Sequence, residues 1–387
     1  MYYVYYNVKI LNDAVLNETA GIININNENS VGIYANGSFD NSNAFHGEET
    51  NYYNNGTINL NSLDGIGIRI DYSGVENAGT IKLLAGAVNS IGMAGTDQTT
   101  TPKNSGLIQL LYGGNENIGI FVNGGNAINL ENGIIRVESQ DSSGILAYNG
   151  TSENKGNIYV DNYDSAGIIA DNSTINMNGG VIENTGNNMA IFGTDNSVIN
   201  LNAGVINTLN EGVSLYLNNG TVVNLKNGFT INVYNDSFML YNKDSSGTYS
   251  SVLNADGIST ANIKESGFAF YYDKNAGSDA EDFLRNTVLG TGTLNLNMEK
   301  GSVLIFLDET AGTSQYLSSL DIDLSNIGSA LKVNSSDYYN YGFNKIGLII
   351  DKNINLDNPD DTYLKSVYSS SAIEINPGIN VTGSEEG

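Results

Sequence analysis

The sequence predicts an all-β chain that winds as a right-handed parallel β-helix with about 24 residues in each coil and with loops that protrude from it. Three observations support this: a repeated phrase, short segments that alternate apolar and polar residues, and corners rich in Gly and Asn. The phrase reads S-T-I-N-M from Ser173, S-V-I-N-L from Ser197 and T-V-V-N-L from Thr221, at a fixed step of 24 residues. A period of this length is typical of a solenoid.

A related phrase, N-x-G-x-I-x-[L/V], extends the repeat toward the N-terminus, with its first occurrence at Asn54. Its glycine recurs every 23 to 27 residues, at Gly56, Gly79, Gly106, Gly133, Gly156, Gly180, Gly204 and Gly228. A second phrase, Gly-Ile with an aliphatic residue two positions after the Ile, alternates with the first, at Gly67, Gly92, Gly119, Gly144 and Gly167. Each coil should therefore contain two or three short strands.

Period-two alternation within these segments separates an inward from an outward face, as in Ile58-Asn59-Leu60. The aligned columns Ile175/Ile199/Val223 and Met177/Leu201/Leu225 should stack in the core. We expect Asn and Gly at the corners because both residues tolerate positive φ. One repeat cannot bury enough apolar surface to order itself, so stacking has to supply the remaining stability.

The repeat divides the chain into two parts. Residues 1–234 should form the regular β-helix, with a loop insertion near 36–53 because the step from Gly21 to Gly56 is 35 residues. Residues 235–387 should continue the β-helix with wider coils and further loop insertions. Within this second part, Ser278 and Glu281 form a capping-box pattern that predicts a short helix through Arg285.

Aromatic residues in the two insertions are the candidate binding residues, because loops that project from a rigid scaffold commonly carry recognition. The alternative for the first insertion is a lid that caps the exposed end of the rod. The candidates are Phe39, Phe45, His46, Tyr52, Tyr53, Tyr271 and Tyr272.

A column of asparagines at Asn176, Asn200 and Asn224 should form an outward stripe, because these residues alternate with inward aliphatic residues. Stacked amides can hydrogen-bond to one another along such a column. Two interpretations stay open: a ladder that only stabilises the coil, and a stripe that faces a glycan or a protein.

Composition excludes several classes of function. The chain carries 42 acidic against 16 basic residues, a net charge of -26, which disfavours a nucleic-acid partner. It has no cysteine, so disulfides and thiolate metal sites are excluded. With the single histidine, His46, lacking an evident partner, we find no catalytic constellation. We therefore expect a protein that is not an enzyme and that has no cofactor and no metal.

The repeated phrases, the Asn-rich corners and the absence of cysteine resemble the passenger repeats of bacterial type V autotransporter adhesins, in the style of the large fusobacterial outer-membrane adhesins. The resemblance extends over about Asn17 to Val233 and more loosely over the remainder. It implies a monomeric rod on the bacterial cell surface or outside the cell. Attachment to the outer membrane would then depend on a leader and a barrel that we expect to lie outside this chain.

The function that the resemblance implies is attachment to host cells or to other bacteria through a surface protein or a glycan. Two alternatives remain. One is a carbohydrate-active β-helix enzyme, either a polysaccharide lyase or a glycoside hydrolase, and the other is a passive spacer in a stalk.

Overall fold

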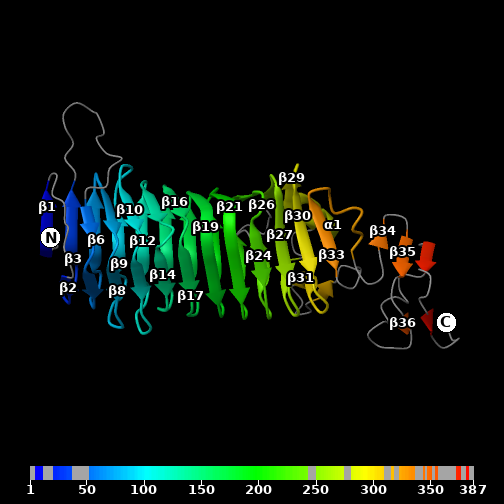
Figure 1. Cartoon of the computed structure of the whole chain (residues 1–387), viewed down its shortest axis with the longest axis horizontal. Coiled ribbons are helices and arrows are strands. Elements are labelled where there is room, and N and C mark those ends of the chain that lie inside the picture. Colours follow the sequence, from blue (N-terminus) through cyan, green and yellow to red (C-terminus); the bar gives the residue numbers. More distant parts are fainter. Residues whose placement is uncertain are drawn as a thin grey trace, which may run out of the picture.

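The structure is a parallel β-solenoid drawn out into a rod (Figure 1). It is a computed structural model that describes residues 5–11, 21–36, 52–242, 250–273, 280–308, 315–317 and 322–335, and five short strands between 343 and 382. Each regular coil adds one strand to a 13-stranded sheet, sheet A, and two strands to a 20-stranded sheet, sheet B. The predicted fold class is confirmed.

Sheet A forms one side of the rod, and its strands pair in parallel except for the last. In spatial order they are β1 (Tyr5–Leu11), β3 (Ser30–Asn36), β6 (Ile66–Asp71), β9 (Ile91–Gly95), β12 (Ile118–Asn123), β15 (Ser143–Tyr148), β18 (Ala166–Asp171), β20 (Met189–Thr194), β22 (Val213–Leu217), β25 (Phe238–Asn242), β28 (Phe268–Asp273), β31 (Val303–Asp308) and the antiparallel β32 (Gln315–Leu317).

Sheet B carries the two remaining strands of each coil, which are fused into one long strand in β19 and in β21. Its strands are β2 (Ile22–Ile25), β4 (Tyr52–Asn54), β5 (Thr57–Leu60), β7 (Gly74–Asn77), β8 (Thr80–Leu83), β10 (Thr101–Asn104), β11 (Leu107–Leu110), β13 (Asn126–Asn129), β14 (Ile134–Val137), β16 (Thr151–Asn154), β17 (Asn157–Val160), β19 (Thr174–Thr185), β21 (Val198–Leu209), β23 (Val222–Leu225), β24 (Thr230–Val233), β26 (Val252–Ala255), β27 (Ile258–Ile263), β29 (Val288–Gly290), β30 (Thr293–Met298) and β33 (Leu331–Ser335).

Two small sheets lie beyond the last coil in the sequence. The first contains β34 (Phe343–Asn344), β35 (Gly347–Ile350) and β37 (Ala372–Ile375), and the second contains β36 (Ile354–Asn355) and β38 (Val381–Thr382).

Pairing between successive coils places like residues on like. Ile199 pairs with Val223 in parallel, and Leu201 pairs with Leu225. The sequence separation between hydrogen-bonded asparagines of successive coils grows from 24 to 30, 35 and 37 residues toward the C-terminus. The longer coils therefore have their additional residues in the connections between strands, and the pairing register of the strands is unchanged.

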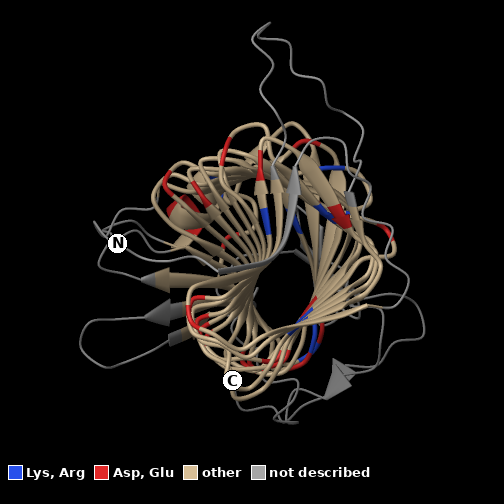
Figure 2. Cartoon of the chain, turned by 90° about the vertical axis from the view of Figure 1, so that its left-hand side faces the viewer, with Lys and Arg blue, Asp and Glu red and all other residues tan. Residues whose placement is uncertain are grey.

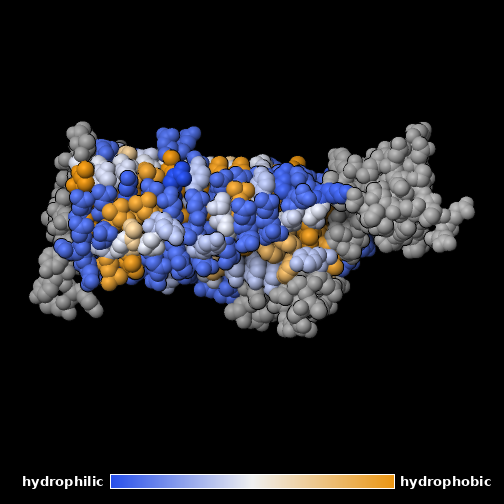
Figure 3. Space-filling view, turned by 90° about the horizontal axis from the view of Figure 1, so that it is seen from below, coloured by the Kyte–Doolittle hydropathy of each residue, from blue (hydrophilic) through white to orange (hydrophobic). Residues whose placement is uncertain are grey.

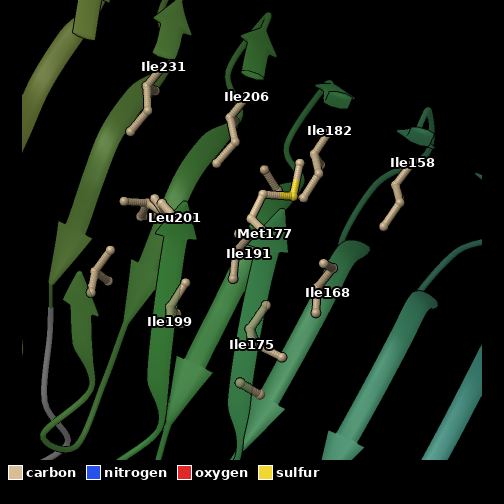
Figure 4. Close-up of a cluster of buried hydrophobic side chains, with 14 of the residues drawn as sticks. Ile158, Ile168, Ile175, Met177, Ile182, Ile191, Ile199, Leu201, Ile206 and Ile231 are labelled. Atoms are coloured by element: carbon tan, nitrogen blue, oxygen red, sulfur yellow. The ribbon is translucent and has the colours of Figure 1, made fainter. Parts of the chain in front are cut away.

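The interior is a shaft of stacked side chains, most of which are apolar. Ile175, Ile199, Met177 and Leu201 are completely buried, and side chains from successive coils lie one above another (Figure 4). The two inward columns predicted from the repeat are therefore confirmed. Close packing of this kind leaves little space for a change in side-chain volume.

The asparagine of the N-x-G phrase serves a different purpose from the one expected. Asn54, Asn77, Asn104 and Asn154 of this phrase, and Asn129 four residues before Gly133, are buried, and their backbones are not left-handed. Each of the first four donates its Nδ2–H to the Oδ1 of the next, at 2.7 to 2.9 Å. Because a buried amide without partners is costly, the ladder explains why this column is asparagine.

The glycine of the same phrase is required by close backbone approach. A Cβ on Gly106 would lie 2.1 Å from the carbonyl oxygen of Gly79, and a Cβ on Gly79 equally close to that of Gly56. The expectation of positive φ is wrong at these three glycines, because the backbone there is not left-handed. It is correct at Gly180, Gly204 and Gly228, later members of the same column, with φ of 68°, 111° and 81°. It is also correct at the turn before sheet A, where Asp64 and Asn89 have φ of 54° and 49°.

The predicted helix is present as α1 (Ala280–Thr287). It does not simply project from the rod, because Phe283 and Leu284 are buried in the main core cluster. Phe283 stacks on Tyr272 of β28 with ring centroids 4.6 Å apart. The insertion that carries α1 is thus packed partly onto the coil.

Replacing Ile199 by Asp should abolish cooperative unfolding, because an unpaired carboxylate would lie between two aliphatic layers. The measurement is a thermal melt followed by circular dichroism. The matched control is Val198→Asp, since Val198 points outward on the same strand. An unchanged melt for Ile199→Asp would contradict its inward position.

Replacing Gly106 by Ala should destabilise the chain by about 1 to 3 kcal/mol, because the added methyl group overlaps backbone that cannot move without breaking strand pairing. Gly179→Ala is the control: its Cβ would meet its nearest neighbour at 3.6 Å, and we expect a change below about 0.5 kcal/mol. Urea unfolding of both variants measures the difference. Equal stabilities would contradict the close approach.

Candidate binding surfaces

The predicted binding residues do not form one site. Phe39, Phe45 and His46 lie outside the described residues. Tyr52 and Tyr53 belong to β4 of sheet B, where Tyr53 is 37% exposed. The other two candidates, Tyr271 and Tyr272, belong to β28 of sheet A and pair with later coils of the rod.

The placement of Tyr271 and Tyr272 on a projecting loop is wrong. Both lie within a strand, and they are only 5% and 1% exposed. Tyr272 packs inward against Phe283, so its side chain is buried inside the coil. Tyr271 is covered by its neighbours Tyr241 and Phe306. We expected these aromatic residues to lie on the insertion itself, but they belong to the strand that precedes it.

The outer face of sheet A carries two rows of side chains that sequence reasoning missed. Strand register aligns them from β9 to β25. Row one contains Ile91, Ile118, Ser143, Ala166, Met189, Val213 and Phe238, and row two contains Ala94, Phe121, Leu146, Ile169, Phe192, Tyr216 and Tyr241. Row two could have been predicted from the Gly-Ile phrase, because it consists of the residue that directly follows the inward aliphatic residue of that phrase.

Aromatic rings in row two stack on each other along the rod. Tyr216 and Tyr241 have centroids 4.8 Å apart and an interplanar angle of 17°, and Tyr241 stacks on Tyr271 at 4.0 Å. Burial, followed by the neighbouring Tyr241, raises the pKa of the Tyr216 hydroxyl. Because these ring faces already contact one another, ring edges are left for any partner.

The outward asparagines of sheet B form two amide ladders. One contains Asn176, Asn200, Asn224 and Asn254, and the other contains Asn207, Asn232, Asn262, Asn297 and Asn334. Each amide donates to the preceding coil at 2.8 to 3.1 Å. The predicted outward column is confirmed as a hydrogen-bonded ladder, and its use as a recognition stripe stays a prediction.

A polar cluster lies at the N-terminal side of sheet A. The Asp71 carboxylate accepts hydrogen bonds from the Thr96 and Tyr34 hydroxyls, at 2.6 and 2.7 Å, and pairs with Arg69 at 3.4 Å. Burial alone would raise the pKa of Asp71, but these hydrogen bonds and the Arg69 charge together hold that pKa below its ordinary 3.8. The cluster therefore keeps this carboxylate ionised and fixed in place.

Within the described ranges, no three His, Cys, Asp or Glu side chains are grouped so that they could hold a metal ion. A search of the same residues found no helix of the length and hydrophobicity that a membrane span requires. Hydrophobic side chains on one side of the rod gather in separate patches among hydrophilic ones (Figure 3).

Comparison with known proteins gives little further information. No protein-family model matches the chain, and no curated protein matches it. Among solved structures, the chain is similar to a TibA fragment, residues 55–350, hyper-glycosylated by TibC. The TM-score is 0.23 at 12% identity, over 86% of this chain and 97% of that chain. A similarity this low does not assign a family or a function.

Asp71→Asn should lower stability more at pH 6 than at pH 3. The folded-state pKa of Asp71 is depressed, so its contribution is present above the unfolded pKa and disappears as pH falls below about 3.8 through the folded value. Urea unfolding of both proteins at the two pH values gives the difference. A difference that does not change with pH would contradict an ionised, hydrogen-bonded Asp71.

Proposed function

We propose that this chain is a surface-exposed passenger segment of an autotransporter adhesin that attaches to host cells or to other bacteria. Its partner is a surface protein or a glycan. It works as a monomeric rod at the bacterial cell surface or outside the cell, without catalysis and without a cofactor.

The observation that carries the proposal is the set of long outward rows on a rigid coil. The amide ladders of sheet B and the apolar rows of sheet A repeat the same group once per coil, with strand neighbours about 4.8 Å apart. Such rows offer an extended surface to a partner instead of one concave site. Extended contact along a solenoid is a common way for repeat proteins to bind.

The acidic surface also supports an exposed, soluble rod. Seen along its axis, the rod carries acidic residues in the turns around the outside of the coil (Figure 2). A net charge of -26 keeps such rods apart from one another by mutual repulsion.

Beads coated with the folded chain should attach to host cells or to bacterial cells in greater number than beads coated with the unfolded Ile199→Asp variant. Microscopy or flow cytometry counts the attached beads. In parallel, a reducing-sugar assay on a polysaccharide panel tests for catalysis. Equal attachment of both bead types would favour a passive spacer. Release of product that a single Asp or Glu substitution abolishes would favour an enzyme.

A further inference from the structure

An apolar strip runs along the outer face of sheet A between β9 and β25. It consists of rows one and two as defined above, and neither row contains a charged residue. Most of these side chains are partly exposed although they are apolar, and Ala94, Ser143 and Ala166 are buried. An apolar surface that extends over seven successive strands is a candidate interaction site, because the largest apolar patch of a soluble monomer is often functional.

The strip is large enough for a specific but weak contact. Seven strands at about 4.8 Å spacing make it about 29 Å long, and two rows of side chains make it about 14 Å wide. This is on the order of 400 Å² on one partner, which corresponds to the small, transient class of interface.

Carboxylates line the edge of the strip where the chain enters sheet A. In each turn before a strand of sheet A, one residue lies two positions before the row-one residue. Its backbone is left-handed in nearly every coil. In six coils this residue is acidic: Asp64, Glu116, Asp141, Asp164, Glu211 and Asp236. The corresponding turns of successive coils, from the turn at residues 61–65 to the turn at residues 234–237, contain no Lys or Arg. Five of the seven strands of the strip are therefore preceded by a carboxylate, while β9 and β20 are preceded by Asn89 and Asn187.

The opposite edge, where the chain leaves sheet A, also carries carboxylates. Asp97 and Asp195 lie in its turns, and Asp171 is the last residue of β18. The turns that follow β12, β15 and β22 hold no carboxylate, and the described exit turns from β9 to β22 contain no Lys or Arg. Burial, followed by the adjacent Asp195, raises the pKa of the Asp171 carboxyl. Asp171 and Asp195, which belong to successive coils, thus lie near each other on this edge.

We propose that the apolar strip is the docking surface for a cationic amphipathic polypeptide. The apolar side chains of this partner pack on rows one and two, and its Lys and Arg side chains reach the carboxylates on both edges. Charge complementarity selects this partner. A second copy of the chain would bring acidic edges against acidic edges, and an anionic lipid surface would meet the same repulsion. The inference deepens the proposed function by naming the chemistry of one partner.

The test uses a fluorescent synthetic helix built from Leu and Lys, long enough to span the strip, and a control helix in which Glu replaces Lys. Fluorescence anisotropy should detect binding of the Leu-Lys helix to the full chain, with weakening as salt is raised. The Leu-Glu helix should not bind. Equal binding of both helices would overturn the charge argument.

Variants locate the contact. Leu146→Ser combined with Ile169→Ser should weaken binding of the Leu-Lys helix about tenfold, which corresponds to about 1.4 kcal/mol. The control, Val198→Ser combined with Val222→Ser, also replaces two aliphatic residues by serine, at outward positions of sheet B, and should leave binding unchanged. Circular dichroism confirms that all variants are folded. If both double variants bind like the unchanged chain, the strip is not the docking surface.

The edges are tested separately. Asp141→Asn, Asp164→Asn and Glu211→Gln together should weaken binding several-fold and flatten its salt dependence. The control is Glu183→Gln, on sheet B. An unchanged salt dependence would overturn the role of the edges, and dimerisation that the Leu146/Ile169 variant abolishes would assign the strip to a second copy. Because these measurements involve no cells, their failure is distinguishable from a failure of bead attachment.

Discussion

Parallel pairing in register is the constraint on which this structure depends. Successive strands lie about 4.8 Å apart, so every side chain has its counterpart from the next coil as its nearest neighbour. A residue type is suitable at a position only if its side chain can pack against the same kind of side chain in the next coil. Aliphatic side chains, amides that donate and accept, and parallel aromatic rings all meet this condition. The columns of the sequence are the consequence.

Much of the fold follows from the sequence because this constraint repeats. The step of 24 residues and the column Ile175, Ile199 and Val223 predict the coil and its core, since buried aliphatic positions leave a periodic signal. The amides of Asn200 and Asn224 are predictable for the same reason. The helix α1 follows from local capping chemistry, which needs no tertiary information.

What the sequence did not predict depends on neighbours in other coils. Asn104 resembles a corner residue in one repeat, and only its stacking between Asn77 and Asn129 makes it a buried ladder residue. The role of Gly106 likewise depends on the carbonyl of Gly79, a full coil away. Tyr272 was placed on a loop because its inward contact, Phe283, comes from the following insertion. The acidic edges of sheet A become visible only when the turns are stacked.

The stacking that builds the core also builds the surface. Because each coil presents the same outward group, a contact made with one coil can be repeated with the next, and binding can extend along the rod. The amide ladders on sheet B and the apolar strip on sheet A differ in chemistry, so they suit different partners. The fold thus provides a long exterior, with different chemistry on each sheet, around a buried and mainly apolar interior.

Cysteine crosslinking tests the register directly, since the chain has no cysteine of its own. Asn200 and Asn224 pair on adjacent coils at a spacing that suits a disulfide, whereas Val223 points to the opposite side of its strand. Mild oxidation should crosslink the Asn200→Cys, Asn224→Cys variant rapidly and the Asn200→Cys, Val223→Cys variant poorly, as judged by mobility on non-reducing gels. Preferential crosslinking of the second pair would contradict in-register stacking.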